Sequence, residues 1–409
     1  MRSRMLPIAV CAALAPGLAH AQQETPPRGV SVEQRQRPDY DPAGVRAGAF
    51  LVLPEVTLEG TYDDNIFATT NNTVDDLVWV VSPRLRVQSD WVRHALAVRT
   101  GAALGFHQDN ADEDFEDYYA FLDGRLDILT GTTANGTVGY ERLHEDRGSP
   151  NDVGGQEPAE FDRWRATLDL QRAVTQLRLR GGVFYDSFDF DDVAGLAGSV
   201  INQDFRDREG YGTYLRAGYA VSPNFVTFLR GRYNWRRYDT DTGRDSEGYQ
   251  IDAGAELDFG GITSGEVFIG YREQEYESAA FSPVDGFTYG ASVLWNPTPL
   301  TSVRFGIVDN IEETIIAGSS SYESVTYSVD VDHELLRNLL IGAGVAYRQE
   351  DFQEINREDD FTRFRVSLSY LLNRNFDIEV GYNYDTRSSN TFGRDYDINR
   401  YFVGFTASL

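Results

Sequence analysis

Histidines beside acidic residues are the side chains of this chain best suited to acid–base chemistry. His107 precedes Asp109 by two positions, and His144 stands directly before Glu145 and Asp146. A histidine oriented by a carboxylate can transfer protons, as in Ser/His or Asp/His sets. Polar residues are also common at the ends of strands, so we predict that the chain is not an enzyme and assign no catalytic residue. An enzyme acting at the rim of a membrane barrel is the alternative.

Acidic clusters offer oxygen ligands for a hard cation. They are Asp63-Asp64-Asn65 and the run from Asp109 to Asp114. Calcium prefers such oxygens, but neither cluster has the spacing of an EF-hand loop. Walker, dinucleotide-binding and zinc spacings are also missing from the chain. We therefore predict no metal site and no cofactor, and interpret the clusters as acidic loop surfaces.

Charged residues that alternate with apolar ones are the strongest candidates for a functional surface. Arg163 and Arg165 flank Trp164, and the apolar alternation continues through Leu168 and Leu170. A charge facing lipid costs a few kcal/mol, so in a membrane strand the charged set must face inward. The predicted pore-lining residues are Arg84, Arg86, Arg99, Arg163, Arg165, Asp169, Arg178, Arg180, Arg230, Arg232, Arg236, Asp252, Glu256, Arg363, Arg365, Asp377 and Glu379.

Two interpretations of these charged rows remain open. They could create a transverse field that orders and selects polar or charged solutes, including uronic-acid sugars. They could equally neutralise one another as ladders with no particular substrate. Most aromatic residues alternate onto the lipid face; the inward exceptions, which could stack on sugar rings, are Tyr119, Phe121, Phe184 and Phe402.

The elements that would position these residues are long strands with period-two alternation. The last segment shows it: one face holds Tyr401, Val403, Phe405, Ala407 and Leu409, and the other holds Phe402, Gly404, Thr406 and Ser408. Such strands are delimited by short turns on one side and long acidic segments on the other. The short turns are placed near Asp90, Gly131, Val174, Pro223, Gly260, Pro297 to Pro299, Arg337 and Arg374.

Eight short turns and nine long loops delimit eighteen strands. We predict an all-β fold, a transmembrane antiparallel up-and-down β-barrel of about 18 strands with short periplasmic turns and long acidic extracellular loops. A soluble β-sandwich or propeller also alternates, but its strands are usually shorter and its turns mixed in length. Most strands expected here are long enough to cross the apolar band of a membrane.

The N-terminus carries an export signal. Arg2 and Arg4 are followed by an apolar stretch and by the small-x-small site Ala19-His20-Ala21, which predicts a signal peptide over residues 1–21. Residues 22–47 are rich in proline and charge, and we expect a flexible periplasmic leader there. The barrel is assigned to residues 48–409. The only cysteine, Cys11, lies in the signal peptide.

Composition excludes two classes of protein. The 409 residues carry a formal net charge of -27, which would repel nucleic acid, so no nucleic-acid partner is predicted. After the signal, no stretch approaches the ~20 apolar residues that a membrane-spanning helix needs. The chain is therefore not a helical membrane protein.

Several short motifs resemble the β-barrel porin type 2 family. Phe50-Leu51-Val52-Leu53-Pro54, followed by Tyr62-Asp63-Asp64-Asn65-Ile66, resembles the opening of that family. Later marks follow in the family's order, and the resemblance covers residues 50–409. They are Ser82-Pro83, Ser222-Pro223, Arg244-Asp245-Ser246, Trp295-Asn296-Pro297-Thr298, His333-Glu334-Leu335, Tyr370-Leu371-Leu372-Asn373-Arg374 and Arg387-Ser388-Ser389-Asn390. The terminal Leu409 departs from the Phe or Trp that usually ends such barrels.

The resemblance implies a location and a function. Members look like Gram-negative outer-membrane barrels, and several are encoded among genes for extracellular polysaccharide synthesis and export, including gellan-type systems. The expected function is a conduit or accessory for surface polysaccharide. The expected partners are outer-membrane lipid, an anionic polysaccharide, a periplasmic export apparatus and the barrel-assembly machinery. A general or small-solute porin with no polysaccharide role is the alternative.

Overall fold

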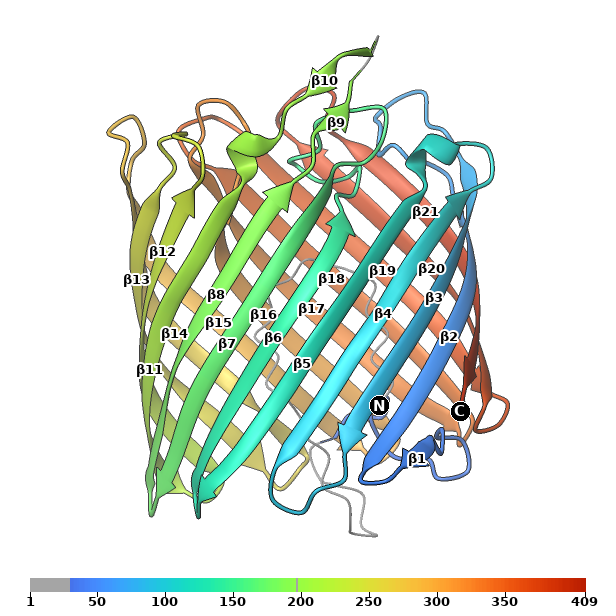
Figure 1. Ribbon diagram of the computed structural model, residues 1–409, viewed down its shortest axis with the longest axis vertical. Helices are drawn as coiled ribbons and strands as arrows, with labels where there is room; N and C mark the ends of the chain where they lie inside the picture. The colour runs from blue at the N-terminus through green and yellow to red at the C-terminus, as the bar shows by residue number, and fades with distance from the viewer. Residues whose placement is uncertain (1–29, 196–197) are drawn as a thin grey trace.

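The protein folds into a closed antiparallel barrel of eighteen strands, as the computed structural model shows (Figure 1). The structure describes residues 30–195 and 198–409. The predicted signal peptide, residues 1–21, lies outside the described residues. The predicted fold class and strand number are confirmed.

The barrel strands are thirteen to sixteen residues long and follow one another in chain order around the wall. They are β2 (Phe50–Asp63), β3 (Asp76–Ser89), β4 (Ala95–His107), β5 (Phe115–Leu129), β6 (Thr132–His144), β7 (Glu160–Val174), β8 (Leu177–Phe190), β11 (Arg208–Ser222), β12 (Phe225–Tyr238), β13 (Ser246–Phe259), β14 (Thr263–Tyr276), β15 (Val284–Thr298), β16 (Thr301–Glu313), β17 (Ser321–Leu336), β18 (Leu339–Phe352), β19 (Glu358–Leu371), β20 (Phe376–Ser389) and β21 (Tyr396–Ser408). The smaller elements are β1 (Val45–Ala47), β9 (Val193–Ala194), β10 (Val200–Ile201) and the short 3₁₀ helices η1 (Ala111–Glu113) and η3 (Asp204–Arg206).

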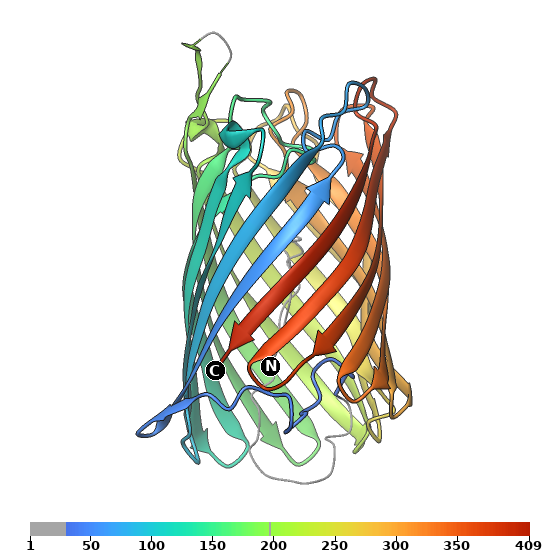
Figure 2. The same ribbon diagram turned by 90° about the vertical axis from the view of Figure 1, so that its right-hand side faces the viewer.

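The first and last barrel strands close the sheet. β2 pairs with β21 from Glu55↔Ser408 to Asp63↔Arg400. The strands are strongly tilted against the barrel axis (Figure 1), as closure of a sheet requires. The barrel is narrower in Figure 2 than in Figure 1, so its cross-section is elongated.

Connections at the two ends of the barrel differ in length. The eight predicted short turns all fall where consecutive strands meet; the β5–β6 turn, for example, is Thr130 and Gly131, with Gly131 at φ 75. A positive φ is inexpensive only for glycine. The other end carries the long loops. Following the pattern of bacterial barrels, we call the turn end the periplasmic mouth and the loop end the outer mouth.

Alternation along the strands separates an apolar outer surface from a polar interior. Leu168, Leu215 and Ile251 are 57%, 65% and 60% exposed on the outer surface. Interior positions are instead filled mainly by charged, polar and small residues, so residues 30–195 and 198–409 form no extended apolar core. One compact apolar cluster, formed by Ala68, Tyr396, Ile398 and Phe361, lies near the outer mouth. No helix among the described residues is long and apolar enough to cross a membrane.

Part of the expected leader is packed along the periplasmic mouth. Residues 30–44, in dark blue at the lower end of Figure 2, run from β17 to β2. The Val32 amide donates to Ser302 Oγ at 2.7 Å, and Arg37 forms a buried ion pair with Glu334 at 3.0 Å. β1 then pairs with β2. No pattern in the sequence indicated these contacts, and the boundary at residue 48 stays a prediction.

Candidate channel lining and outer constriction

All seventeen predicted pore-lining residues occupy strand positions that point into the barrel. Their neighbours along each strand are exposed on the outer surface: Trp164, between Arg163 and Arg165, is 52% exposed, and Leu229, before Arg230, is 63% exposed. Arg178 stands at the periplasmic mouth and Arg236 at the outer mouth; the others lie between. Their role in solute selection stays a prediction.

Most lumen arginines form ion pairs with acids on neighbouring strands. Arg99 meets Asp123 at 2.6 Å, and Arg180 meets Asp169 at 3.0 Å. The Arg230 guanidinium reaches the fully buried Asp252 at 2.7 Å. A buried charge is tolerated when it is paired in this way. The rows therefore stabilise the interior, as the ladder interpretation expects, although this leaves open whether they also act on solutes.

The charges are distributed unevenly around the lumen. We call β7, β8, β11 and β12 the basic wall, since their lumen positions hold nine arginines and two acids, Asp169 and Asp186. The nine are Arg163, Arg165, Arg178, Arg180, Arg208, Arg216, Arg230, Arg232 and Arg236.

A second group of four strands has the opposite balance. We call β17 to β20 the acidic wall, since their lumen positions hold eight acids and four arginines. The acids are Asp330, Asp332, Glu334, Glu350, Asp359, Asp377, Glu379 and Asp385. At least four strands separate the two walls on either side of the barrel. The lumen is therefore predominantly basic on one side and predominantly acidic on the other.

Arg232 differs from the other cations of the basic wall. No ion pair or hydrogen bond of its side chain occurs within residues 30–195 and 198–409, whereas Arg216 and Arg230 share Glu266 at 3.0 Å each. Arg232 stands midway along β12, beside Tyr214 on β11 and Gln250 on β13. Its guanidinium is therefore the lumen cation with most bonding capacity left for a solute.

The inward aromatic rings are covered by other side chains. Arg99 lies 4.9 Å from the centre of Phe121, and Arg365 lies 5.4 Å from the centre of Phe402, which is only 3% exposed. Phe184 packs over Gly212, where a Cβ would come within 2.6 Å of the ring. These are cation–π and packing contacts. The rings therefore offer little free face for stacking on a sugar.

The β6–β7 loop, residues 145–159, extends across the outer mouth. On its own side, Arg147 forms a two-pronged ion pair with Glu113, at 2.6 and 2.7 Å. On the far side, the Asn151 amide donates to the Glu313 carbonyl at 3.1 Å. Arg387 of β20 donates to the Gly148 carbonyl at 3.2 Å. We call residues 145–159 the constriction loop, because these contacts tie it to three separate parts of the wall.

The outer end of β16 meets the constriction loop and completes the closure. Glu313 accepts bonds from both Arg236 and Tyr238 of β12. Arg244 donates to the Ser319 carbonyl at 2.9 Å in the β16–β17 loop. A small cavity of about 30 Å³, lined in part by Asn151 and Glu313, lies between these groups. The contacts of the constriction loop and of β16 thus narrow the outer mouth.

Burial changes the proton affinity of groups in the constriction loop. It raises the pKa of Asp152, and Arg147 offsets this effect only in part. For Arg147 itself, burial lowers the pKa, but the hydrogen bond and charge of Glu113 more than compensate, so the net pKa is raised. Arg147 therefore stays charged, while Asp152 takes up a proton more readily than an ordinary aspartate.

Sequence reasoning missed the constriction residues. Arg147 and Arg206 lie between the barrel strands, where no periodicity marks orientation. Glu313 and Arg387 lie at the outer ends of β16 and β20, where alternation does not show that a strand turns inward. Arg206 forms an ion pair with Glu145 at 2.9 Å, across 61 residues of sequence. Only the length of the loops signalled that they could fold inward.

His107 and His144 lie beside acidic residues at the outer ends of β4 and β6. His144 Nδ1 lies 2.9 Å from Asp117, and its ring stacks on Phe115 at 4.1 Å. His107 Nδ1 lies 3.6 Å from Asp114, and not from Asp109. Groups of three or more potential metal ligands are not found in the described part of the chain. The absence of catalysis stays a prediction.

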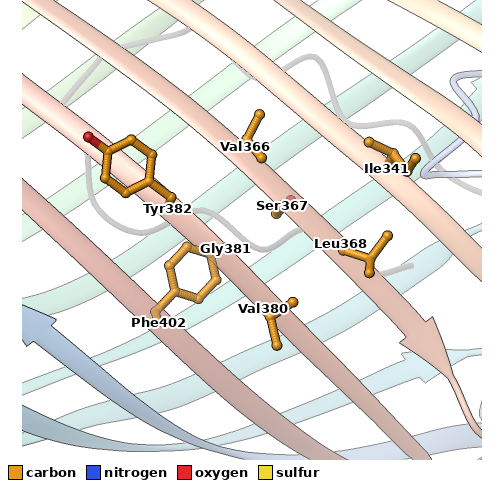
Figure 3. Close-up of a pocket in the computed structure, with 8 residues that line it drawn as sticks. All are labelled: Ile341, Val366, Ser367, Leu368, Val380, Gly381, Tyr382 and Phe402. Carbon is orange, nitrogen blue, oxygen red and sulfur yellow. The ribbon is translucent and has the colours of Figure 1, made fainter.

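An apolar depression on the β18–β21 wall is a poor candidate for solute binding. Figure 3 shows Val366, Leu368 and Val380 around it, with the Phe402 ring beside Gly381. The three aliphatic side chains are each between a third and two fifths exposed on the lipid-facing surface. Because these side chains face lipid, the depression belongs to the lipid-facing surface. Few polar groups converge there to bind a hydrophilic solute.

The closed barrel, its apolar exterior and its charged interior define an outer-membrane β-barrel with a porin-like channel. The chain belongs to the family described as "Putative beta-barrel porin 2", whose model matches residues 37–409. The resemblance found in the sequence is thereby confirmed. This class of barrel is generally non-enzymatic. No curated protein matches the sequence.

Several solved structures are similar to this chain at low sequence identity. OpdO of Pseudomonas aeruginosa is 17% identical with a TM-score of 0.46, over 88% of this chain and 97% of OpdO. OccAB4 of Acinetobacter baumannii is 15% identical with a TM-score of 0.46, over 88% and 98%. The ferric citrate transporter FecA in the unliganded form is 11% identical with a TM-score of 0.47, over 85% of this chain; the chain spans 61% of FecA.

Proposed function

We propose that the protein is a passive channel for small hydrophilic solutes that carry an anionic group, such as the carboxylate of a uronic-acid sugar. The uneven charge of the lumen is the observation that supports this proposal. The basic wall attracts the anionic group and the acidic wall repels it, so the solute is oriented with this group toward the basic wall. The small outer opening favours small solutes over folded polymers.

The net charge of -27 does not oppose this selectivity. Charges separated by more than a Debye length, about 8 Å at physiological ionic strength, are largely screened. A solute beside Arg232 therefore responds chiefly to the basic wall.

A second candidate function, export of surface polysaccharide, is supported by the family resemblance and by the size of an eighteen-stranded barrel, wide enough for an aqueous channel. For this function residues 22–47 would contact a periplasmic export apparatus, and the basic wall would guide an anionic polysaccharide. Both candidates place the protein in the Gram-negative outer membrane after Sec-type export, inserted by the barrel-assembly machinery among outer-membrane lipids.

A strain lacking the gene, compared with the complemented strain, distinguishes the two candidates. The experiment records released polysaccharide and uptake of a uronic-acid sugar in parallel. Slowed uptake with normal polysaccharide supports the solute channel. Polysaccharide lost or trapped in the periplasm, with normal uptake, contradicts it and supports export.

A further inference from the structure

The β15–β16 pair is regular only in its periplasmic half. Pairing ends at Ala291↔Ile307. Farther out, Val284 to Gly290 pair with β14, and residues 308–313 pair with β17. Within the described chain, the outer seven residues of β15 therefore have no strand partner toward β16. An open strand edge at a membrane surface leaves backbone groups without partners, which is costly.

The outer half of β16 lies on the lumen side of its neighbours. Phe305 is 40% exposed to lipid, so alternation assigns Asp309 and Glu313 to the same face. Yet Asp309 forms an ion pair at 2.7 Å with Arg272, from the lumen face of β14, and Glu313 meets Arg236, from the lumen face of β12. The β16–β17 hairpin is therefore folded inward, with its outer surface against the inner surface of β12 to β15.

The sequence also fits an outward position of this hairpin. If the register of Ala291↔Ile307 continued, Phe287 would stand opposite Ile311. Phe287 is 80% exposed in the inward arrangement, and the two apolar side chains would share the lipid face. The same continuation would supply β15 with its missing backbone partners. The length and polarity of both strands thus suit a continuous pair.

A recurrent tyrosine contact supports this second register. On the outer surface, Tyr249 donates to Glu273, its direct partner on the next strand, at 2.6 Å. Continued pairing would place Tyr289 opposite Asp309 in the same way. In the inward arrangement Tyr289 instead bonds the hydroxyl of Tyr327 at 2.5 Å. Tyr289 and Asp309 therefore each have a polar partner in either position of the hairpin.

We propose that the β16–β17 hairpin is a gate with two positions. The inward position narrows the outer mouth and is held by Arg272 and Arg236. The outward position completes the β15–β16 ladder and widens the mouth. The β16–β17 ladder is intact in both positions, and β17 is also paired with β18 as far as Tyr322↔Phe352. The hairpin therefore moves together with the outer end of β18, about the end of the regular β15–β16 pairing. Competing polar contacts and backbone bonds make two populated positions physically reasonable.

A disulfide trap tests the gate without reference to any solute. Cys11 is the only cysteine of the full chain and lies in the predicted signal peptide, so the mature protein supplies a cysteine-free background. The variant F287C/I311C places thiols that can meet only in the outward position. The matched control V293C/F305C joins residues that are already paired. The two pairs are six residues apart along each strand, so they share the same class of antiparallel position.

The gate predicts that F287C/I311C forms its disulfide under mild oxidant and that oxidation raises single-channel conductance several-fold, reversibly on reduction. V293C/F305C is expected to crosslink without a change in conductance. A control that crosslinks while F287C/I311C does not would overturn the proposal. So would a crosslinked F287C/I311C with unchanged conductance.

A spectroscopic measurement tests the gate independently, in case the disulfide variant does not assemble. Nitroxide labels at positions 287 and 311, one label per cysteine, report the distance between them by pulsed electron paramagnetic resonance. The gate predicts two distances, with the shorter gaining population in R272Q, which removes an inward contact. A single long distance in both proteins would overturn the proposal. Neither result depends on which solute the channel carries.

Discussion

The basic wall and the acidic wall are built from the same kind of strand but carry opposite charge. Each consists of four strands with alternating faces, and in each most arginines are paired with acids. The difference lies in what is left over: arginines are in excess on one wall and carboxylates on the other. Pairing stabilises the interior, while the unpaired excess is what the proposed selectivity depends on. In the proposed function, stability and selectivity therefore use different residues of the same rows.

Removing the constriction loop should separate the effect of size from the effect of the walls, and it should produce the largest change. Replacing residues 147–156 by a short Gly-Ser link removes the bridge from Arg147 to Asn151. We expect single-channel conductance in planar bilayers to rise several-fold, with weaker discrimination between anionic and neutral solutes. Shortening the loop at residues 391–393, where Phe392 is fully exposed, is the control. Equal conductance in the two variants would contradict the assigned constriction.

Neutralising Arg232 should weaken the basic wall. A unit charge about 4 Å from its partner in water contributes about 1 kcal/mol, equivalent to a roughly fivefold preference. R232Q is therefore expected to lower the anion-to-cation permeability ratio by up to about fivefold, measured as a reversal potential in a salt gradient. R84Q is the matched control, since Arg84 lies outside both walls and pairs with Glu55 at 3.3 Å. Equal shifts of the reversal potential in R232Q and R84Q would show that Arg232 contributes no more to anion selectivity than Arg84 does.

Neutralising the acidic wall should act in the opposite direction. Asp330 faces the lumen from β17 and forms no ion pair within the described residues. D330N is expected to raise the anion-to-cation ratio roughly twofold, less than the effect of Arg232, because anions pass farther from this wall and Coulomb energy falls with distance. The same reversal potential measures it. A shift in the same direction as R232Q would show that the two walls do not differ.

Acidification should produce the smallest effect, through the constriction loop. The pKa of Asp152 is raised by burial, so the packed loop binds this proton more tightly than the released loop does. Docking is therefore favoured at low pH and weakens as pH rises above the ordinary aspartate pKa of about 3.9. We expect conductance to fall modestly on acidification, and to fall less in D152N. An identical pH profile in D152N would exclude Asp152 as the titrating group.

Period-two alternation was sufficient to predict the barrel, its strand number and the inward position of the charged residues. Alternation fixes the face of each residue but not the register between strands, so the pairs Arg99–Asp123 and Arg230–Asp252 could not be predicted. Which charges of each wall are left unpaired depends on pairs of this kind. From the sequence alone, two interpretations of the charged rows therefore stayed open: selection of solutes, and mutual neutralisation of the charges.

The structure of the outer mouth could not be predicted, because β16 departs there from the rule that alternate residues face lipid and lumen. Along β16 the alternation continues to Glu313 while the strand itself turns into the lumen. The sequence held one signal of this departure: Asp309 is an acid at a position that alternation assigns to lipid. The long loops gave a second, weaker one, since loops of that length can fold either inward or outward.

The account is tested most directly by the permeability of the purified wild-type channel to two sugars of similar size, glucose and glucuronate, in proteoliposomes. A lumen divided into a basic and an acidic wall predicts faster entry of glucuronate, with the advantage shrinking as salt screens the walls. Equal entry at all salt concentrations, or faster entry of glucose, would contradict it.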